Sequence, residues 1–429
     1  MKKIILATIL TLICIPFILI GQQLNLDNSI TISSGSDGFG RPRIALTNSG
    51  PIIIWRKDST PKVLRASKWN GSSFGQPYDI CSSGVLPSSW DGPEIAAKGD
   101  TVYVVFTSTA TSQSSIMLIR SFDGGTTFSD TIRVSENDPS HKFRMGNIKI
   151  DKDGNPIINY MQYLLNWTEP KQMVNRSTDY GNSFLGSVNA SFSAPGEPCD
   201  CCKASLVLDN DDIYLLFRNN NNNERNSYLS KSVDGGLSFP QVSDLDDYDW
   251  IVSGCPATGP LGVVNGDSIL IVRRSGSTGN DEIVYNNIDK SDLNYSYTRN
   301  IDPITGKIQD YPDLALNGDT IFIVWKDNRN NTPDCFLSYS TTGIEGLSLG
   351  ISFTDTTVTG PKLNPDIEFK NNIVHIVYNH NSLNSIEYVK GSLGPISSVN
   401  EIKIDNKRTI NFDLLGRKSK IPFNKLIFK

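Results

Sequence analysis

The octapeptide SFDGGTTF, residues 121–128, returns as STDYGNSF at 177–184 and as SVDGGLSF at 232–239. The copies begin 56 and 55 residues apart, a period typical of repeat architectures. Aspartate can fix a tight turn by accepting backbone N–H groups, and glycine tolerates the positive φ that such turns need. We therefore expect hairpin turns in which the repeated residues are structural: Ser121, Asp123, Gly125, Phe128, Ser177, Asp179, Gly181, Phe184, Ser232, Asp234, Gly236 and Phe239.

Short apolar runs recur with the same period along the rest of the chain. Their last residues are Trp55, Phe106, Tyr160, Phe217, Val272, Trp325 and Tyr378, with gaps of 51, 54, 57, 55, 53 and 53 residues. Each run is short, rich in β-branched or aromatic residues, and opened by a polar turn, which indicates a strand. A second short strand precedes each run, a third follows it, and in all units but the last a fourth comes after the third.

Four antiparallel strands repeated at this period predict an all-β fold, a β-propeller of four-stranded blades. A single four-stranded sheet cannot cover both of its faces, whereas blades stacked around an axis bury them against their neighbours. We expect seven blades, with six as the alternative. The seventh unit lacks a fourth strand, and the stretch SITISSG at 29–35 is expected to supply it from the N-terminal end.

The two ends of the chain differ from the repeats in composition. Residues 1–21 begin with Lys2 and Lys3 and continue with an uncharged apolar run, which predicts a cleaved signal peptide, with an uncleaved anchor as the alternative. Residues 22–398 form the expected propeller, and no later stretch in the sequence could span a bilayer. Residues 399–429 hold eight Lys/Arg and three Asp/Glu, a net charge of +5 in a chain whose total is −5.

The net charge limits the expected binding partners, and the cysteine content indicates which covalent cross-links to expect. A net charge of −5 argues against a protein that neutralises nucleic-acid phosphates. Six cysteines follow the signal peptide, an even number that suggests disulfides in an oxidising compartment: Cys81, Cys199, Cys201, Cys202, Cys255 and Cys335. Six cysteines allow fifteen pairings, so the sequence leaves the connectivity open.

The repeated turn resembles the Asp-box of sialidases and related secreted propellers, and the resemblance covers residues 25–397. The box residues lie in turns, so the resemblance implies that chemistry belongs to the opposite face, where longer loops enter the blades. Sialidases bind a carboxylate with three arginines and use a tyrosine nucleophile, activated by a glutamate, together with an aspartate acid/base. The corresponding candidates here are Arg41, Arg43, Asp91, Arg218, Arg273, Arg274 and Tyr311. No glutamate partner for Tyr311 is evident, and each arginine could instead serve a structural ion pair.

A second resemblance is carried by the cysteines. CDCCKASLVLDNDDIYLLFR at 199–218, followed by DYDWIVSGCPATGP at 247–260, is similar to a group of secreted bacterial sialidase-like propellers. The two segments enter adjacent blades on one face, which favours a disulfide between Cys255 and one of the three clustered cysteines. The alternative is a soft metal site that uses these thiols and His141. Because secretion favours oxidation, we expect no metal and no other cofactor.

The tail carries a third resemblance. FDLLGRK at 412–418 resembles an element of the C-terminal sorting domains of Bacteroidota type IX secretion, and the tail is expected to hold two short strands joined by a turn. The sequence thus predicts an extracellular or cell-surface propeller with a glycan as its substrate or ligand. The leading hypothesis is an exo-acting, sialidase-like glycoside hydrolase. The alternative is a non-catalytic propeller that binds glycan or protein at the cell surface.

Overall fold

The computed structural model describes residues 22–395, apart from 39, 58, 60, 61, 82, 83, 87–90, 109–112, 297 and 356, and also residues 411–412 and 418–419. The expected signal peptide and most of the basic tail lie outside the described residues. Two units can be distinguished, one of Asn25–Ser392 and one of Met1–Leu24 with Leu393–Lys429. Within the described residues, helices long and apolar enough to cross a membrane are absent.

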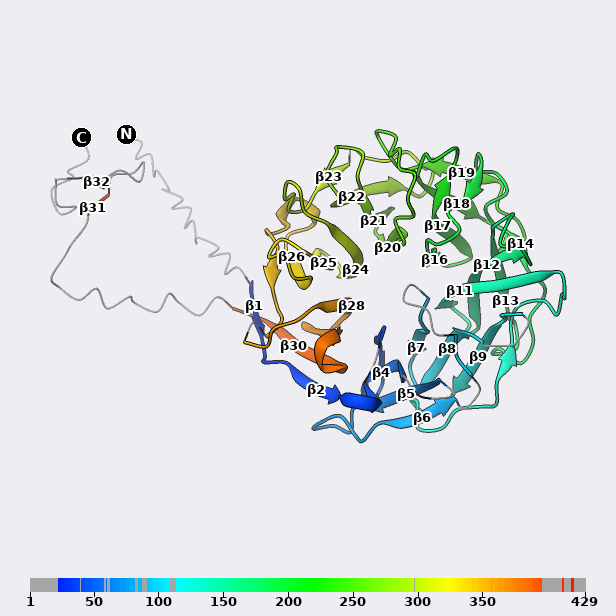
Figure 1. Ribbon diagram of the computed structural model, residues 1–429, viewed down its shortest axis with the longest axis horizontal. Coiled ribbons are helices and arrows are strands. Elements are labelled where there is room, and N and C mark those ends of the chain that lie inside the picture. Colours follow the sequence, from blue (N-terminus) through cyan, green and yellow to red (C-terminus); the bar gives the residue numbers. More distant parts are fainter. Residues whose placement is uncertain are drawn as a thin grey trace, which may run out of the picture. The chain divides into compact units, whose positions relative to one another are not determined.

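The larger unit is a seven-blade β-propeller, so the prediction of seven four-stranded blades is confirmed and the alternative of six is excluded. Figure 1 shows the blades following one another around a ring, with the first strand of each blade nearest the centre. The seven inner strands are β3 (Arg43–Thr47), β7 (Glu94–Lys98), β11 (His141–Ile150), β16 (Ser205–Asp209), β20 (Leu261–Asn265), β24 (Gln309–Asn317) and β28 (Lys362–Lys370).

The second and third strands of each blade carry most of the apolar runs. The second strands are β4 (Gly50–Lys57), β8 (Thr101–Thr107), β12 (Pro156–Leu164), β17 (Asp212–Asn220), β21 (Ser268–Ser275), β25 (Thr320–Asp327) and β29 (Ile373–His380). The third strands are β5 (Val63–Lys68), β9 (Ile116–Ser121), β13 (Lys171–Arg176), β18 (Ser227–Ser232), β22 (Glu282–Asp289), β26 (Asp334–Ser340) and β30 (Ser385–Pro395).

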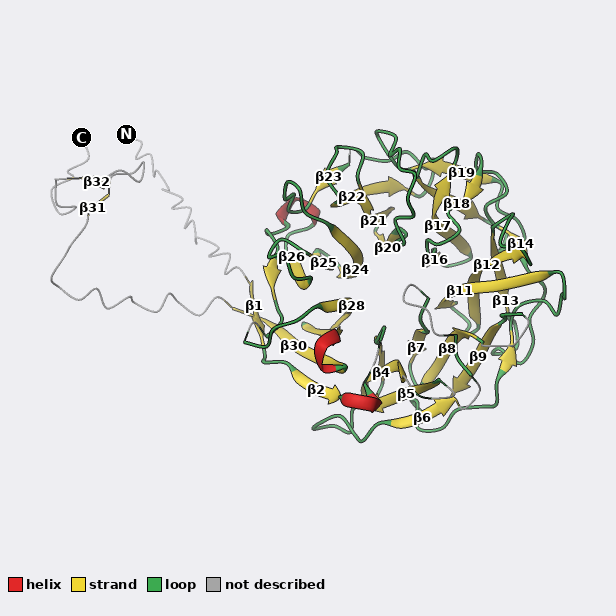
Figure 2. Cartoon of the chain, in the orientation of Figure 1, coloured by secondary structure: helices red, strands yellow, loops and turns green. Residues whose placement is uncertain are grey.

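The outer strands are short, as expected at the rim of a ring. In blades one to six they are β6 (Tyr78–Cys81), β10 (Ile132–Arg133), β14 (Val188–Asn189), β19 (Gln241–Asp244), β23 (Arg299–Asn300) and β27 (Ile351–Ser352). A further two-residue strand, β15 (Glu197–Pro198), pairs with β17. Helical structure in the described residues is restricted to three single 3₁₀ turns, η1 (Gly35–Asp37), η2 (Ile344–Gly346) and η3 (Asn381–Leu383) (Figure 2).

The N-terminal end of the propeller closes the ring, as predicted. Strand β2 (Ile30–Ser33) pairs antiparallel with β30, so that Ile30 lies opposite Tyr388 and Thr31 opposite Glu387. Strand β1 (Gln22–Leu26) also pairs with β30. The last blade therefore combines strands from both ends of the chain, and the N-terminal strands cover the outer edge of β30.

Strand alternation explains how the blades bind one another. On β8, the side chains of Val102, Val104 and Phe106 pack into the cluster shared with blade one, while Tyr103 and Val105 pack into the cluster shared with blade three. Successive side chains of a strand point to opposite faces, so one apolar run fills two interfaces. The near-continuous hydrophobicity of these runs follows from burial on both faces.

The repeated Ser-x-Asp-x-Gly turns lie between the third and fourth strands of their blades. In the first copy, Asp123 Oδ1 accepts hydrogen bonds from the backbone N–H groups of Thr126 and Thr127, both at 2.9 Å. The amide of Gly124 donates to the carbonyl of Asp100, in the turn between β7 and β8. The box turns thus share one rim with the short first turns, and the inner strands begin at the opposite rim.

The smaller unit contains one described hairpin. Strand β31 (Asn411–Phe412) pairs antiparallel with β32 (Lys418–Ser419). This agrees with the two short strands expected in the tail. Its role as a sorting signal stays a prediction.

Candidate functional site

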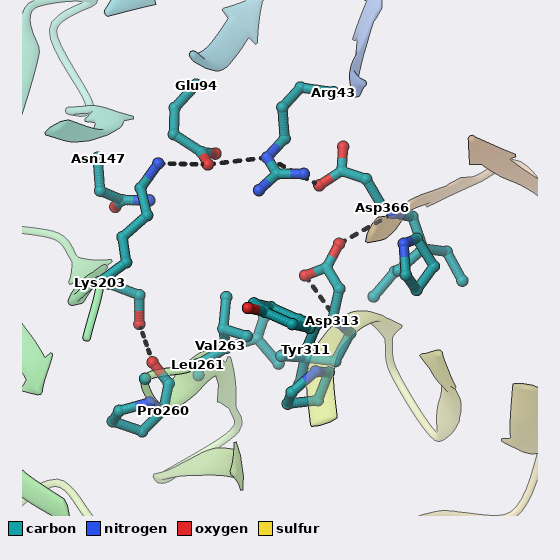
Figure 3. A pocket seen from close by; sticks show the side chains of 18 of the residues that line it. Arg43, Glu94, Asn147, Lys203, Pro260, Leu261, Val263, Tyr311, Asp313 and Asp366 are labelled. Carbon is teal, nitrogen blue, oxygen red and sulfur yellow. Dashed lines mark hydrogen bonds and ion pairs between the residues drawn. The ribbon is translucent and has the colours of Figure 1, made fainter. Parts of the chain in front are cut away.

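The inner strands enclose a cavity of about 280 Å³, referred to below as the channel. All seven of them contribute to its wall, together with the segments that lead into them. Figure 3 shows side chains from separate blades pointing into this space. Any ligand in the channel would therefore contact residues of the inner strands and of the segments that lead into them.

A backbone feature recurs where the chain enters the inner strands. Left-handed backbone, with φ between 50° and 57°, occurs at Arg41, Ala257, Tyr311 and Asn364, all of which line the channel. Such a conformation costs energy for residues other than glycine. Because it recurs in several blades, it belongs to the architecture, and the side chain at each position is the variable part.

Side chains two positions later hold neighbouring blades together. The carboxylate of Asp366 accepts the N–H of Ile44 at 2.7 Å, and that of Asp313 accepts the N–H of Ile367 at 2.9 Å. At a third junction, the side-chain oxygen of Asn147, two positions after Met145 with its left-handed φ of 62°, accepts the N–H of Leu206 at 3.1 Å. We call these contacts the blade clasps, after Asn147, Asp313 and Asp366.

A chain of ion pairs lies along the channel wall. Glu94 Oε1 accepts hydrogen bonds from Arg43 Nε at 2.8 Å and from Lys203 Nζ at 2.7 Å (Figure 3). Arg43 Nε also lies 3.6 Å from Asp366 Oδ1. Burial opposes ionisation of Glu94, but Arg43 and Lys203 outweigh it and lower its pKa to about 2. Three blades and the segment before β16 are thus joined by charge as well as by the clasps.

Arg41 and Tyr311 meet at the end of the channel where the inner strands begin. The guanidinium carbon of Arg41 lies 5.2 Å from the centroid of the Tyr311 ring, and Lys326 Nζ lies 4.9 Å from the same centroid. These are cation–π distances. Burial raises the pKa of Tyr311, an effect that Arg41 opposes, and burial together with Arg43 lowers the pKa of Arg41 to about 10.

Asp91 lies beside this pair in the fold. It is buried, accepts a hydrogen bond from Thr107 Oγ1 at 2.9 Å, and lies 3.6 Å from Arg144 Nε. The next residue, Gly92, packs so closely on Arg41 that an added Cβ would lie 2.7 Å from its Cδ. A larger residue at position 92 would therefore displace the side chain of Arg41.

Arg274 and Asp310 complete this group. Arg274 Nη2 lies 2.9 Å from Asp281 Oδ1, and its Nη1 lies 3.6 Å from Asp310 Oδ2. Asp310 also pairs with Lys326 at 2.9 Å. We refer to Arg41, Asp91, Arg274, Asp310 and Tyr311 as the mouth residues.

The other two candidate arginines bind their own chain. Arg218 is fully buried and donates to three backbone carbonyl oxygens, those of Thr258, Arg225 and Arg274. Arg273 is also fully buried, and its partners are Asp246 Oδ1, Asn286 Oδ1, Thr298 Oγ1 and the carbonyl of Leu245. The guanidinium groups of Arg41, Arg218 and Arg273 therefore have separate environments.

The expected cysteine contact is present beside the channel. Cys201 and Cys255 form a disulfide, while Cys81, Cys199, Cys202 and Cys335 are free and buried. The Sγ atoms of Cys199, Cys201, Cys202 and Cys255 all lie within 4.8 Å of one another, and this cluster is the set of residues best suited to hold a metal ion in the described chain. His141 does not join them, because its Nδ1 pairs with Asp138.

The sequence places Glu94 and Asp313 on the face that carries the candidate site but assigns them no role, and the clasp residue Asp366 and the ion-paired Lys203 were missed. A signal for most of them is present in the chain. The sequences RPRI at 41–44, GPEI at 92–95, YPDL at 311–314 and NPDI at 364–367 share a proline before a charged residue at the start of an inner strand.

Comparison with solved structures shows the fold in other proteins. An ulvan lyase of a new polysaccharide lyase family matches with a TM-score of 0.53 and 10% identity, over 85% of this chain and 95% of that one. The polysaccharide lyase Uly1 matches with a TM-score of 0.52 and 8% identity, over 84% and 91%. At such identities the likeness establishes the architecture and no activity.

A Hadza microbial sialidase also aligns, with a TM-score of 0.47 and 14% identity, over 84% of this chain. The match spans 66% of the length of that sialidase. No protein-family description matches the chain, and no curated protein does.

Proposed function

We propose that this protein is a secreted glycan-processing enzyme of the sialidase type, which binds an acidic sugar at the mouth residues. The observation that carries the proposal is the contact between Arg41 and Tyr311, 5.2 Å from guanidinium carbon to ring centroid. A guanidinium suits the carboxylate of the sugar, and a phenol held beside it can attack the adjacent anomeric carbon without the repulsion that a carboxylate nucleophile would meet.

The proposed roles follow from the environments of the side chains. Arg41 binds the sugar carboxylate, Tyr311 is the nucleophile, and buried Asp91 is the acid/base. Arg43 and Arg274 are held by carboxylates and contribute positive potential. The guanidinium groups of Arg218 and Arg273 are already hydrogen-bonded within the protein, so these two arginines act as positioning residues.

A second candidate is a lyase acting on an acidic polysaccharide. Glu94, a glutamate of the channel wall, pairs with Arg43 and Lys203 and has no hydrogen bond to Tyr311 in the described contacts. A tyrosine next to an arginine, without an activating glutamate, suits β-elimination. The phenolate removes the C5 proton of a uronate whose carboxylate the arginine neutralises, the C4–O bond breaks as a C4–C5 double bond forms, and the tyrosine passes the proton to the departing oxygen. The ulvan lyase with the same fold was solved bound to a glucuronic acid–sulfated rhamnose unit.

One set of assays separates these functions. The purified chain is given a fluorogenic sialoside and, separately, a uronate-containing polysaccharide whose cleavage is followed by the ultraviolet absorbance of the unsaturated product. Tyr311→Phe should lower kcat at least about a hundredfold, and Arg41→Lys should act mainly on KM. Arg133→Ala, on the exposed outer strand of blade two, is the matched control and should leave rates unchanged.

The outcomes are exclusive. Release of the fluorophore supports the hydrolase, and an unsaturated product supports the lyase. If neither substrate turns over but the sugars still bind and binding needs Arg41, the protein is a non-catalytic glycan receptor. If neither substrate binds, the proposal fails.

A further inference from the structure

The four cysteines beside the channel form a compact sulfur cluster. Cys199, Cys201, Cys202 and Cys255 place their Sγ atoms within 4.8 Å of one another, and Cys199 Sγ lies 3.6 Å from Cys201 Sγ. Four thiolates around a tetrahedral zinc ion, with Zn–S bonds of about 2.3 Å, stand roughly 3.8 Å apart. Cys199 and Cys201 already have that spacing, whereas Cys201 and Cys255 are joined by a disulfide and would separate on its reduction. Thiolates are the donors that soft and borderline d¹⁰ cations prefer.

The electrostatics of the surroundings point the same way. Arg218 is fully buried; in the described contacts its guanidinium donates to three carbonyl oxygens, lies 4.8 Å from the centroid of the Trp250 ring and forms no ion pair. A buried charge without a counter-charge is costly. The backbone amide of Cys199 donates a hydrogen bond to the carbonyl oxygen of Arg218, so the cluster lies next to this residue. Asp246 already acts on Arg218 with an opposite charge, and a thiolate cluster with its net negative charge would add to it.

We propose that Cys199, Cys201, Cys202 and Cys255 bind one d¹⁰ metal ion, Zn²⁺ or Cu⁺, in the reduced chain. Four thiols each lose a proton to solvent and four sulfur–metal bonds form, with no electron transfer. The Cys201–Cys255 disulfide is the alternative, two-electron oxidation product of the same cluster. A chain in that state would bind the ion only after a dithiol had reduced the bond, supplying two electrons and two protons.

The position of the cluster assigns the ion a structural role. Lys203 and Ala204 directly follow Cys202, residues 257–260 follow Cys255, and both segments line the channel. The segments touch so closely that a Cβ on Gly259 would lie 1.7 Å from the Lys203 carbonyl oxygen. All four ligands come from the protein, so the site is closed, and the ion would tie together two walls of the channel. This role is independent of the proposed enzymatic function.

Metal titration of the full secreted chain tests the proposal. The chain is purified with a phosphine reductant in metal-free buffer, and mass spectrometry after alkylation counts the free thiols. Co²⁺ is then added as a spectroscopic probe, followed by Zn²⁺ against a chromophoric chelator and, in a separate arm, Cu⁺ against a copper(I) chelator. We expect one equivalent of Co²⁺ with thiolate-to-cobalt charge-transfer bands, displaced by one equivalent of Zn²⁺ or Cu⁺. The ion that competes with its chelator at the higher affinity is identified as the preferred metal ion of the cluster.

Variants distinguish the cluster from other thiols. Cys199→Ser and Cys202→Ser should each weaken binding more than about a hundredfold. Cys335→Ser removes a free, fully buried cysteine of blade six and should leave the titration unchanged. Circular dichroism identifies variants that fail to fold. Where a variant does not fold, the proposal is judged from the stoichiometry and the charge-transfer spectrum of the wild-type chain. The proposal is overturned if the wild-type chain, with all its thiols reduced, gives no charge-transfer band, or if Cys199→Ser binds as tightly as Cys335→Ser.

Discussion

The carboxylate of Asp366 accepts a hydrogen bond from the backbone amide of Ile44 at 2.7 Å, although the two residues are 322 positions apart. The contact joins the inner strand of the last blade to that of the first. Asp313 and Asn147 make the corresponding contact at two other junctions. The ring is therefore closed near its axis by a side chain as well as at its rim by β2. Asp313 and Asp366 thus stabilise the fold, whether or not they take part in a reaction.

Removal of this closing clasp should destabilise the propeller. Asp366→Ala leaves the Ile44 amide without its acceptor and removes a partner of Arg43, so we expect a loss of about 1–3 kcal/mol in the free energy of unfolding. Asp366→Asn keeps an acceptor oxygen and should lose less. Chemical denaturation measures both, with the exposed Asp130→Ala as control. Equal stability of Asp366→Ala and the wild type would show that the clasp contributes nothing.

The box turns should affect stability without affecting the site. Asp123 also accepts a hydrogen bond from Thr127 Oγ1 at 2.6 Å, so Asp123→Ala should lower the melting temperature by a few degrees. Its turn lies at the rim opposite the mouth residues, and kcat/KM should stay within about twofold of the wild type. Assays well below the melting temperature keep the two effects apart. A large loss of activity in a variant that is still folded would place the box residues in the site.

Regular features of the fold could be predicted from the sequence because they follow from spacing. The apolar runs that end at Trp55 and Trp325 belong to one evenly spaced series along the chain. Strands that are buried on both faces must be apolar throughout, which makes such runs easy to recognise. The closing strand could be predicted because the last blade lacked one. Local patterns of this kind need no knowledge of side-chain direction.

The candidate site was predictable only in part, since it depends on where long side chains end. Arg218 and Arg273 follow apolar runs just as Arg274 does, but their guanidinium groups are enclosed by carbonyl oxygens and other polar side chains of the protein. Nothing in the sequence distinguishes a guanidinium that faces a channel from one that holds a loop. Lys203 pairs with Glu94 109 positions away, a contact that only the closed ring creates.

A partly buried glutamate of the channel wall, Glu368, should make stability depend on pH. Burial raises the pKa of Glu368 to about 7 from the ordinary value of 4.5, although Lys149 opposes the shift. The folded chain holds this proton more tightly than the unfolded chain does. The stabilisation is therefore complete below about pH 4.5 and is lost as the pH rises through about 7. Melting temperatures across this range should fall for the wild type and fall less for Glu368→Gln.

The matched control for this measurement is Glu169→Gln, which alters an exposed glutamate in the loop after β12. It should follow the wild-type curve. If Glu368→Gln has the same pH profile as the wild type and this control, Glu368 does not hold its proton in the folded chain.

Glu94 should show the opposite pH behaviour and a strong coupling to Lys203. Its pKa of about 2 lies below the ordinary value of 4.5, so its contribution is present above about pH 4.5 and is lost as the pH falls through about 2. At neutral pH, Glu94→Gln leaves the partly buried cations of Arg43 and Lys203 without their shared carboxylate, and we expect destabilisation by about 3–5 kcal/mol. Lys203→Met leaves Glu94 paired with Arg43 and should cost less.

A double-mutant cycle tests this arrangement, because the second substitution removes one of the cations that the first leaves unpaired. Glu94→Gln combined with Lys203→Met should therefore be more stable than the sum of the single losses predicts, by roughly 1–3 kcal/mol. Chemical denaturation of the four chains gives the coupling energy. Asp130→Ala combined with Lys203→Met pairs the same lysine with a carboxylate that is not its partner, and it should be additive. Additivity in the Glu94 cycle as well would mean that the wall of the channel is held by packing and the clasps alone.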